Sequence, residues 1–587
     1  MSTDPAEQPS RRRPLPQGDG TGRSSRAAAR RRGRRGHRRR SGFRTPAFLL
    51  TALLVVALGA GASLVWDPFT AGAGSASQAR PEIGTPWSTG PVPDDDRAPT
   101  TAPGTTAPGT GTGTATPGAS RSALPVVPRT PDTPVRRRGG PLPFDLPSPE
   151  RLRASGKLVF AHYFTPYPLS LDNVAPERDY YARNYLKPEG ESGKHARYGG
   201  LLRDRPLPVA PKSGDWELAN LKEEVRTARA AGLDGFTLDL LSLSGKNWER
   251  STMLLEAARA VDPAFKIQLM PDMTSLRTDP AGLADALATL ARSPAAHRLP
   301  DGRLVVTPFK AEAKDPAWWK QMMDSLRTRH GIRTALVPLF LDFGPHATPF
   351  APISYGFTEW GSRSYVGQEP AGRDTRRAHE LGKIWMQPVS VQDARPNQGI
   401  FDEAGNTSTL RATWKHAIED RADWVQLTTW NDYSEGSQFA PSLHNGHAYL
   451  DLTSYYLTRF KTGSYPKIVR DTLYLTSRVQ FAGTAPTGGQ KLVMRLRGGS
   501  AAARDRVEVL SFLTAPSTLR TTTGSARTDR QVPAGVNVEL YPLRSGTNST
   551  TALRGGRTAT KVTLGYPVSR IVTVQDLQYY AATSGRS

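Results

Sequence analysis

Residues 216–241 read WELANLKEEVRTARAAGLDGFTLDLL, and this stretch decides the fold. Its first part predicts a helix, because its apolar residues recur at i, i+3, i+7 and i+10 along one face: Leu218, Leu221, Val225 and Ala228. An apolar run bounded by glycine, Gly235–Leu241, follows and predicts a buried strand. A helix that leads at once into a buried strand is the repeating unit of an α/β fold.

The same alternation repeats from Lys157 to about Phe460. Helical patterns separate eight apolar runs: Leu158–Phe164, Gly235–Leu241, Lys266–Asp272, Arg303–Phe309, Thr334–Phe340, Ser354–Trp360, Lys383–Val389 and Trp424–Trp430. Eight strands, each followed by a helix, predict an α/β fold of the (β/α)8, TIM-like barrel type over residues 151–464. An open doubly wound sheet is the alternative, but no GxGxxG or P-loop segment supports it.

Residues 465–587 show a different period. Apolar residues alternate with polar ones in several short stretches, such as Leu473–Phe481 and Val536–Leu540, between turns rich in Gly, Pro, Ser and Thr. This pattern predicts a C-terminal antiparallel β-sandwich domain. Two roles are open for it, a structural support for the barrel or a carbohydrate-binding module.

The N-terminal part predicts a membrane topology. Residues 1–44 contain fourteen Arg and three acidic residues, so they carry +11 of the formal charge of +24. Pro46–Trp66 follows with 21 uncharged residues, and about 20 apolar residues span a bilayer core. Because basic flanks stay in the cytoplasm, we expect a cytoplasmic tail (1–44), a transmembrane signal-anchor (45–66) and an extracellular remainder. The alternative is a signal peptide cleaved near residues 71–77, which gives a secreted protein.

This topology explains the basic tail without a nucleic-acid partner, and the expected partner of the N-terminal segment is the membrane. Residues 67–150 consist mainly of Pro, Thr, Gly, Ser and Ala. Because such a segment has few large apolar side chains to offset its chain entropy, it predicts a disordered linker.

The composition excludes several chemistries. The chain has no cysteine, which excludes disulfides, thiol nucleophiles and Cys-ligated zinc. It has no HExxH segment, no paired-His spacing and no EF-hand loop, so we expect neither a metal nor a cofactor. No GxSxG segment follows a predicted strand, so a serine nucleophile is not expected. We expect a monomer.

Carboxylates, amides and aromatic side chains close the predicted strands. In a (β/α)8 barrel the reactive side chains lie at these C-terminal strand ends, and aromatic rings with polar groups suit a sugar polymer. Eight residues are therefore predicted to bind substrate: His162, Tyr163, Asp239, Asp272, Trp385, Gln387, Trp430 and Asn431. Structural alternatives are a helix N-cap for Asp272 and a core histidine bonded to a backbone carbonyl for His162.

Two acids follow the eighth run, in the segment WNDYSE (Trp430–Glu435). Cleavage of a glycosidic bond needs two carboxyl groups, one to protonate the leaving oxygen and one to activate water or attack the sugar carbon. Asp432 and Glu435 lie three residues apart just beyond a strand end, so both can face one cleft. We predict that they are the catalytic pair, with Glu435 as the acid.

These segments resemble glycoside hydrolase family 71, the α-1,3-glucanases or mutanases. LTTWNDYSE (427–435) resembles the family's TWNDYGES motif, and VFAHYF (159–164) its VFAHF start. AGLDGFTLD (231–239) is similar to AGIDGFALN, and LMPDM (269–273) to FDMS. The matches keep the family's order over roughly residues 157–560.

The resemblance implies an inverting endo-hydrolase of α-1,3-glucan, in which Asp432 and Glu435 occupy the positions of the paired catalytic acids. It also implies a third essential aspartate: Asp239 and Asp272 are candidates by their strand-end positions and Asp234 by its place in the motif. Asp234 has a helix N-cap as its structural alternative.

The chain departs from the family pattern at several points. Ser434 replaces the Gly of the motif, Gly436 replaces its Ser, and Asp239 stands where Asn is usual. The first strand is followed by Thr165-Pro166-Tyr167-Pro168 and a long insertion to about Ser213, whose tyrosines would border the substrate cleft. Two other functions stay open: a non-catalytic glycan-binding or wall-organising protein, and a hydrolase of a different cell-wall polysaccharide.

Overall fold

The structure, a computed structural model, describes residues 142–368 and 370–586. The predicted cytoplasmic tail, the segment 45–66 and the linker up to residue 141 lie outside this part. No helix within the described part is long and apolar enough to span a bilayer. The end of the predicted linker is partly packed: residues 142–144 are buried, and the backbone of Phe144 pairs with Ile468.

The first folded region is a barrel of parallel strands. Nine strands share one sheet in the order β5-β4-β3-β2-β1-β11-β8-β7-β6. Their bounds are β1 Leu158–Tyr163, β2 Gly235–Leu240, β3 Lys266–Pro271, β4 Leu304–Val306, β5 Thr334–Leu336, β6 Leu339–Phe340, β7 Gly356–Glu359, β8 Ile384–Val389 and β11 Trp424–Leu427.

The two end strands of this sheet, β5 and β6, are one run interrupted only at Val337-Pro338. Val337 N–H donates to Val306 of β4, and Pro338 C=O accepts from Thr358 of β7. Counting β5 and β6 as one strand, the sheet therefore closes on itself with eight strands, one from each predicted run. The prediction of a (β/α)8 barrel is confirmed, and the open doubly wound sheet is excluded.

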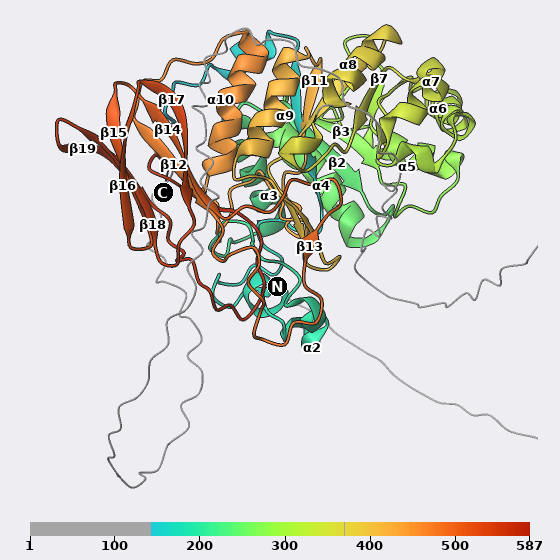
Figure 1. Ribbon diagram of the computed structural model, residues 1–587. Coiled ribbons are helices and arrows are strands. Elements are labelled where there is room, and N and C mark those ends of the chain that lie inside the picture. Colours follow the sequence, from blue (N-terminus) through green and yellow to red (C-terminus); the bar gives the residue numbers. More distant parts are fainter. Residues whose placement is uncertain (1–141, 369, 587) are drawn as a thin grey trace, which may run out of the picture. The chain divides into compact units, whose positions relative to one another are not determined.

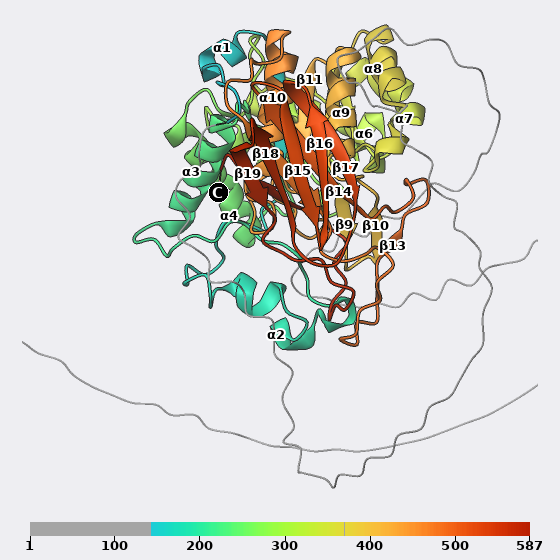
Figure 2. The same ribbon diagram turned by 60° about the vertical axis from the view of Figure 1, so that its left-hand side comes forward.

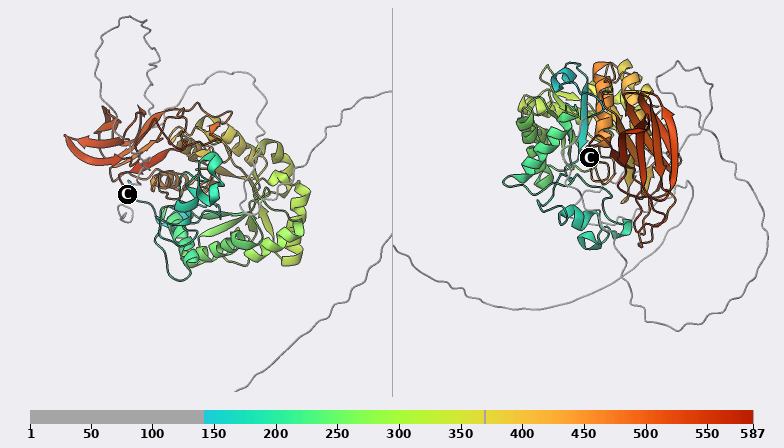
Figure 3. Two further views of the ribbon diagram at one scale, coloured as in Figure 1. Left: turned by 90° about the horizontal axis from the view of Figure 1, so that it is seen from below. Right: turned by 90° about the vertical axis from the view of Figure 1, so that its left-hand side faces the viewer.

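A helix follows each of these eight strands and lies on the outside of the barrel (Figure 1, and Figure 3, left). The helices in chain order are α3 Trp216–Ala230, α4 Gly245–Val261, α5 Pro280–Leu290, α6 Pro316–His330, α7 Phe343–Phe350, α8 Pro370–Glu380, α9 Ser408–Glu419 and α10 Ala448–Thr462, after the short α1 Pro149–Arg153. Local sequence sets their ends: the carboxylate of Asp315 caps α6 at Trp318 N–H (2.8 Å), and Gly331 ends it with φ +67°.

The alternation along each strand separates two cores. Residues such as Leu238 and Leu269 face outward and pack under the helices in the main apolar cluster. Residues such as Val305, Met386 and Trp424 face inward and pack against one another inside the barrel. Because neighbouring residues of a strand point to opposite faces, this alternation decides which strand-end side chains reach the mouth.

The C-terminal region contains two four-stranded antiparallel sheets, in the orders β17-β14-β12-β20 and β16-β15-β18-β19 (Figure 2). Their strands are β12 Thr472–Ser477, β14 Arg506–Leu513, β15 Ser517–Thr523, β16 Ala526–Val532, β17 Gly535–Pro542, β18 Asn548–Arg554, β19 Arg557–Thr563 and β20 Tyr580–Thr583. One apolar cluster joins Leu475 and Val509 of the first sheet to Leu519 and Ala552 of the second. This confirms the predicted β-sandwich.

The barrel and the sandwich share packing. Tyr474 and Phe512 of the sandwich belong to the same apolar cluster as Tyr455 of α10, and the rings of Tyr455 and Phe512 lie 5.0 Å apart. A small sheet of β9 (Asp393–Arg395), β10 (Ile400–Asp402) and β13 (Arg495–Leu496) also joins the two regions. It lies at the same end of the molecule as α2 (Gly190–Gly193) in both views (Figures 1 and 2).

Candidate active site

The C-terminal ends of the barrel strands bring polar side chains together over the inner core. His162 of β1 and Asp239 of β2 face inward, and their Nε2 and Oδ2 atoms lie 3.4 Å apart. Trp360, which follows β7, places its ring edge-on to His162 at 5.1 Å. All three positions have the inward parity of their strands, so the barrel geometry itself aims them at the mouth.

The two acids of the segment after β11 lie at the same place. Asp432 and Glu435 are 7% and 8% exposed. The Asp432 carboxylate contributes to the electrostatic surroundings of both His162 and Asp239. Asp432 Oδ1 accepts hydrogen bonds from the N–H (3.0 Å) and the hydroxyl (2.6 Å) of Ser434.

Two arginines, which the sequence reasoning missed, complete the cluster. Arg395 of β9 donates from Nη1 to Glu435 Oε1 (2.7 Å) and pairs with Asp393 (2.5 Å). Arg363, four residues after β7, stacks on Trp360 with its guanidinium 4.5 Å from the ring centroid. Both arginines lie in loops after the strands, whereas the predicted site residues lie at or just beyond the strand ends.

Burial is the main cause of the protonation of these acids, and neighbouring charges modify its effect. Burial raises the pKa of Glu435 to about 8; Arg395 opposes this effect, while Asp432 and Asp393 add to it. Burial also raises the pKa of Asp432, against the Ser434 hydrogen bonds and Arg395. Burial, with the charges of Asp272 and Asp432, raises the pKa of Asp239 well above its ordinary value. Burial beside other carboxylates thus favours the protonated forms of Glu435 and Asp239.

Burial lowers the pKa of His162 to about 4, so its ring is neutral at physiological pH. Several buried polar atoms of the cluster have no hydrogen-bond partner among residues 142–368 and 370–586, including His162 Nδ1, Asp239 Oδ1 and Glu435 Oε2. Because buried polar atoms are normally paired, such atoms at a barrel mouth are suited to a polar ligand rich in hydroxyl groups.

The two departures from the family motif have local reasons. Ser434 adds the hydroxyl that bonds Asp432. Gly436 has φ +63°, and a Cβ there would lie 2.3 Å from Nε2 of Gln578, in the C-terminal segment. Glycine is therefore required at position 436 both by the backbone conformation and by the close approach of Gln578.

Other predicted substrate-binding residues lie outside this cluster. Tyr163 and Trp430 face outward from the barrel and pack on Phe236, with ring centroids 5.2 and 5.0 Å apart. Asn431 holds the chain after β1: its Oδ1 accepts from Phe164 N–H (2.8 Å) and its Nδ2 donates to the carbonyls of Phe164 and Tyr167 (2.9 Å each). Asn431 therefore positions this loop and has no free amide for a sugar.

Strand β8 also turns its predicted residues outward. Trp385 is fully buried against Phe343 of α7, with ring centroids 4.9 Å apart, and its Nε1 donates to Gln387 Oε1 (2.8 Å). Met386, between them, faces the inner core. The sequence locates the strand but not its parity, and the parity places Trp385 and Gln387 under the helices.

The remaining aspartates have structural partners. Asp234 precedes β2 at the opposite end of the barrel, where it accepts from Val159 N–H (2.7 Å) and pairs with buried Lys461 of α10. Asp272 faces the mouth, but its oxygens accept from Thr274 N–H (2.7 Å), Thr274 Oγ1 (2.6 Å) and Ser275 Oγ (2.9 Å). Asp272 thus caps the turn after β3 and adds negative charge beside Asp239.

The sequence comparison agrees with this geometry. The profile described as "Glycosyl hydrolase family 71" matches residues 209–586. The chain belongs to glycosyl hydrolase family 71. It is therefore a glycoside hydrolase built on a (β/α)8 barrel and a β-sandwich.

Its relatives in this family are distant in sequence. A mutanase of Penicillium rubens is 26% identical over 374 residues, 59% of this chain and 80% of the mutanase. A glucan endo-1,3-α-glucosidase of Schizosaccharomyces pombe is 23% identical over 371 residues, 59% of this chain and 86% of that enzyme. Among solved structures, an endo-α-mannosidase of family GH99 from Bacteroides thetaiotaomicron aligns with 52% of this chain and 97% of its own, at 15% identity and a TM-score of 0.40.

For a family 71 hydrolase, the cluster supplies what glycoside cleavage needs. It holds two buried carboxyl groups near the barrel mouth, one fixed by an arginine and one by a serine. It also holds a neutral histidine and a third carboxyl that can bind hydroxyl groups. No group of three or more His, Asp or Glu side chains in the described part is arranged to hold a metal ion.

Proposed function

We propose that this family 71 hydrolase is endo-acting, cleaves α-1,3-glucan and inverts the configuration at the sugar carbon. Glu435 is the general acid and Asp432 is the general base. The observation that carries the proposal is the pairing of a carboxyl with a pKa of about 8 with a second acid three residues away, at the mouth of the barrel. The names of the Penicillium and Schizosaccharomyces relatives support the choice of polymer.

The hydrogen bonds support this division of roles. Arg395 occupies Oε1 of Glu435, so the proton resides on Oε2, which is free to reach a glycosidic oxygen. Ser434 donates twice to Oδ1 of Asp432 and favours its charged form, as a base requires. In an inverting reaction Asp432 removes a proton from water as the water attacks the sugar carbon, while Glu435 protonates the departing oxygen.

Activity on a panel of insoluble and soluble α- and β-glucans tests the proposal. We expect the full chain to release reducing ends from α-1,3-glucan, and Asp432→Asn and Glu435→Gln each to lose about 100- to 10,000-fold in kcat. Wild-type activity in either variant would disprove the assigned pair. Binding without release from any glucan would favour a glycan-binding protein, and release only from another polymer would change the substrate. The anomer formed first, observed by NMR, decides between inversion and retention.

We further propose that the catalytic region lies outside the cell membrane, tethered by Pro46–Trp66 or secreted after cleavage. The support is the uncharged segment and its basic flank. The test is protease treatment of intact cells, with a cytoplasmic protein as control. Digestion of the barrel in intact cells is expected, and its protection until lysis would contradict the proposal.

A further inference from the structure

The insertion after β1 carries a group of tyrosines that the proposed acid–base mechanism does not use. Tyr180, Tyr185 and Tyr198 are half-buried, so each keeps part of its ring in contact with solvent. Tyr180 and Tyr185 contact edge to face with ring centroids 5.0 Å apart. Together these three residues are here called the tyrosine face.

Buried Tyr167 links the tyrosine face to the segment that carries the acid pair. The ring of Tyr185 lies 6.0 Å from that of Tyr167, nearly perpendicular to it. Tyr167 in turn contacts Tyr433, which directly follows Asp432, at 6.5 Å. A polymer whose scissile bond lies at Asp432 therefore has the tyrosine face as a neighbouring surface.

Half-buried Glu191 and buried His195 fix two of the three rings. Glu191 accepts from the Tyr180 hydroxyl at Oε1 (2.6 Å) and contacts His195 Nε2 at Oε2 (2.5 Å). The other ring nitrogen of His195, Nδ1, bonds the hydroxyl of Tyr198 (2.5 Å). With a proton on His195 Nε2, both tyrosine hydroxyls donate inward. The ring orientations are then set before any ligand arrives, which lowers the entropy cost of binding.

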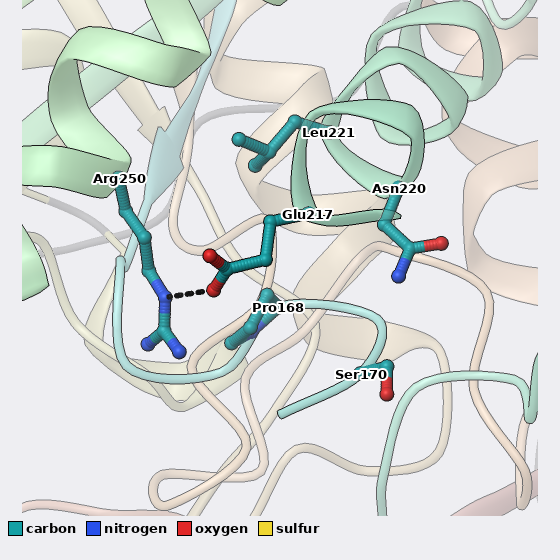
Figure 4. A pocket seen from close by; sticks show the side chains of 6 residues that line it. All are labelled: Pro168, Ser170, Glu217, Asn220, Leu221 and Arg250. Carbon is teal, nitrogen blue, oxygen red and sulfur yellow. Dashed lines mark ion pairs between the residues drawn. The ribbon is translucent and has the colours of Figure 1, made fainter. Parts of the chain in front are cut away.

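The base of the insertion is also fixed. Tyr181, between Tyr180 and Tyr185 in the sequence, donates from its hydroxyl to Pro168 C=O (2.6 Å). Leu169 N–H donates to Glu224 of α3 (3.0 Å). Figure 4 shows Pro168 and Ser170 beside α3, with Arg250 of α4 directed toward Glu217 of α3. The hydrogen bond from Leu169 therefore ties the start of the insertion to α3.

We propose that the tyrosine face is a binding subsite for the glucan chain next to the acid pair. The inference rests on the proposed function for its ligand, a polysaccharide. Pyranose rings present flat C–H faces that stack on aromatic rings, while their hydroxyl groups bond phenolic oxygens. Fixed tyrosines beside a carboxylate pair match this chemistry.

The experiment measures binding to insoluble α-1,3-glucan by the full chain carrying Asp432→Asn, so that the polymer is not degraded. Adding Tyr180→Ala with Tyr198→Ala is expected to weaken binding about five- to tenfold. The matched control is Tyr355→Ala, because Tyr355 is also half-buried but precedes β7 at the other end of the barrel. Tyr180→Phe with Tyr198→Phe keeps both rings and is expected to retain most of the binding.

Thermal unfolding of each variant shows whether weaker binding comes from the missing tyrosine rings or from an unfolded protein. If the alanine pair unfolds early, Tyr180→Leu decides, since it keeps an apolar side chain but removes the flat ring. Unchanged binding in the alanine pair or in Tyr180→Leu would overturn the subsite, as would absence of binding by the parent protein. Hydrolysis by the wild-type chain is scored separately. Hydrolysis without tyrosine-dependent binding would refute the subsite alone, and tyrosine-dependent binding without hydrolysis would refute the proposed reaction alone.

Discussion

At the scale of single residues, the character of the acid pair depends on the groups that surround it. Burial and neighbouring acids raise the pKa of Glu435 to about 8, and Arg395 opposes this rise. The arginine comes from β9, in the loop after β8, about 40 residues before the acid that it contacts. Arg395 therefore favours the charged form of Glu435.

We expect kcat/KM on α-1,3-glucan to fall as the pH rises through about 8, because Glu435, the proposed general acid, then loses its proton. Arg395→Met removes a charge that lowers the pKa of Glu435, so the alkaline limb should move to higher pH while the rate falls. Arg411→Met is the control, since Arg411 pairs with Glu508 instead. The measurement is the pH profile of the three proteins; a limb that moves to lower pH in Arg395→Met would contradict the assignment.

Asp234 lies in a family motif, but it bonds Val159 and Lys461 at the end of the barrel opposite the mouth. We expect Asp234→Asn to lower the free energy of unfolding by about 3–5 kcal/mol, because it leaves buried Lys461 without its counter-charge. Activity per folded molecule should stay within about twofold of wild type, since general acid–base effects of 100-fold or more belong to residues at the reacting bond.

Denaturant unfolding and kcat of the folded fraction measure these two effects. The double variant Asp234→Asn with Lys461→Met is the control, and it should recover part of the lost stability. A stable Asp234→Asn protein that has lost its activity would instead make Asp234 the third essential acid that the family resemblance implies.

At the scale of elements, strand parity separates site residues from core residues. β7 and β8 are neighbours; Trp360 directly follows β7, and Trp385 is the second residue of β8. Trp360 faces inward and contacts His162, whereas Trp385 faces outward under α7. The two residues are a matched pair for testing whether the mouth binds sugar.

We expect Trp360→Ala to raise KM or lower kcat by about tenfold or more, with a smaller effect on stability, because it removes a ring beside His162 and Arg363. Trp385→Ala should cost about 3–5 kcal/mol of stability, as a buried tryptophan does, with kcat of the folded protein nearly unchanged. Steady-state kinetics and denaturant unfolding measure both effects. If Trp360→Ala lost mainly stability and Trp385→Ala lost mainly activity, the inward and outward assignments of the two side chains would be wrong.

At the scale of the whole molecule, the sandwich supports the catalytic loops. Tyr579 donates its hydroxyl to Glu403 (2.6 Å), which also pairs with Arg478 (2.7 Å). Gln578 packs against Gly436, next to Glu435. Strands β15, β16, β18 and β19 contain no aromatic residue that could stack on a sugar. Of the two roles that the sequence left open, these contacts favour a support.

We expect a chain that ends at residue 464 to lack activity and a cooperative thermal transition. Removal of the sandwich would expose the apolar side of α10 around Tyr455 and take away the partners of Glu403 and Gly436. The full chain is the control, and circular dichroism with a reducing-end assay is the measurement. A soluble, active barrel without the sandwich would show that its contacts are dispensable.

The sequence by itself determined the eight strands, the helices between them, the sandwich and the family, because periodicity and short motifs are local properties of the chain. It also located Asp432, Glu435, His162 and Asp239 at strand ends. Which strand-end side chains face inward was decided only by the tertiary structure, since one residue of register exchanges the two faces of a strand. The same holds for Arg395, the Ser434 and Gly436 contacts and the Glu191–His195 support of the tyrosine face, because these contacts depend on how loops and distant segments pack.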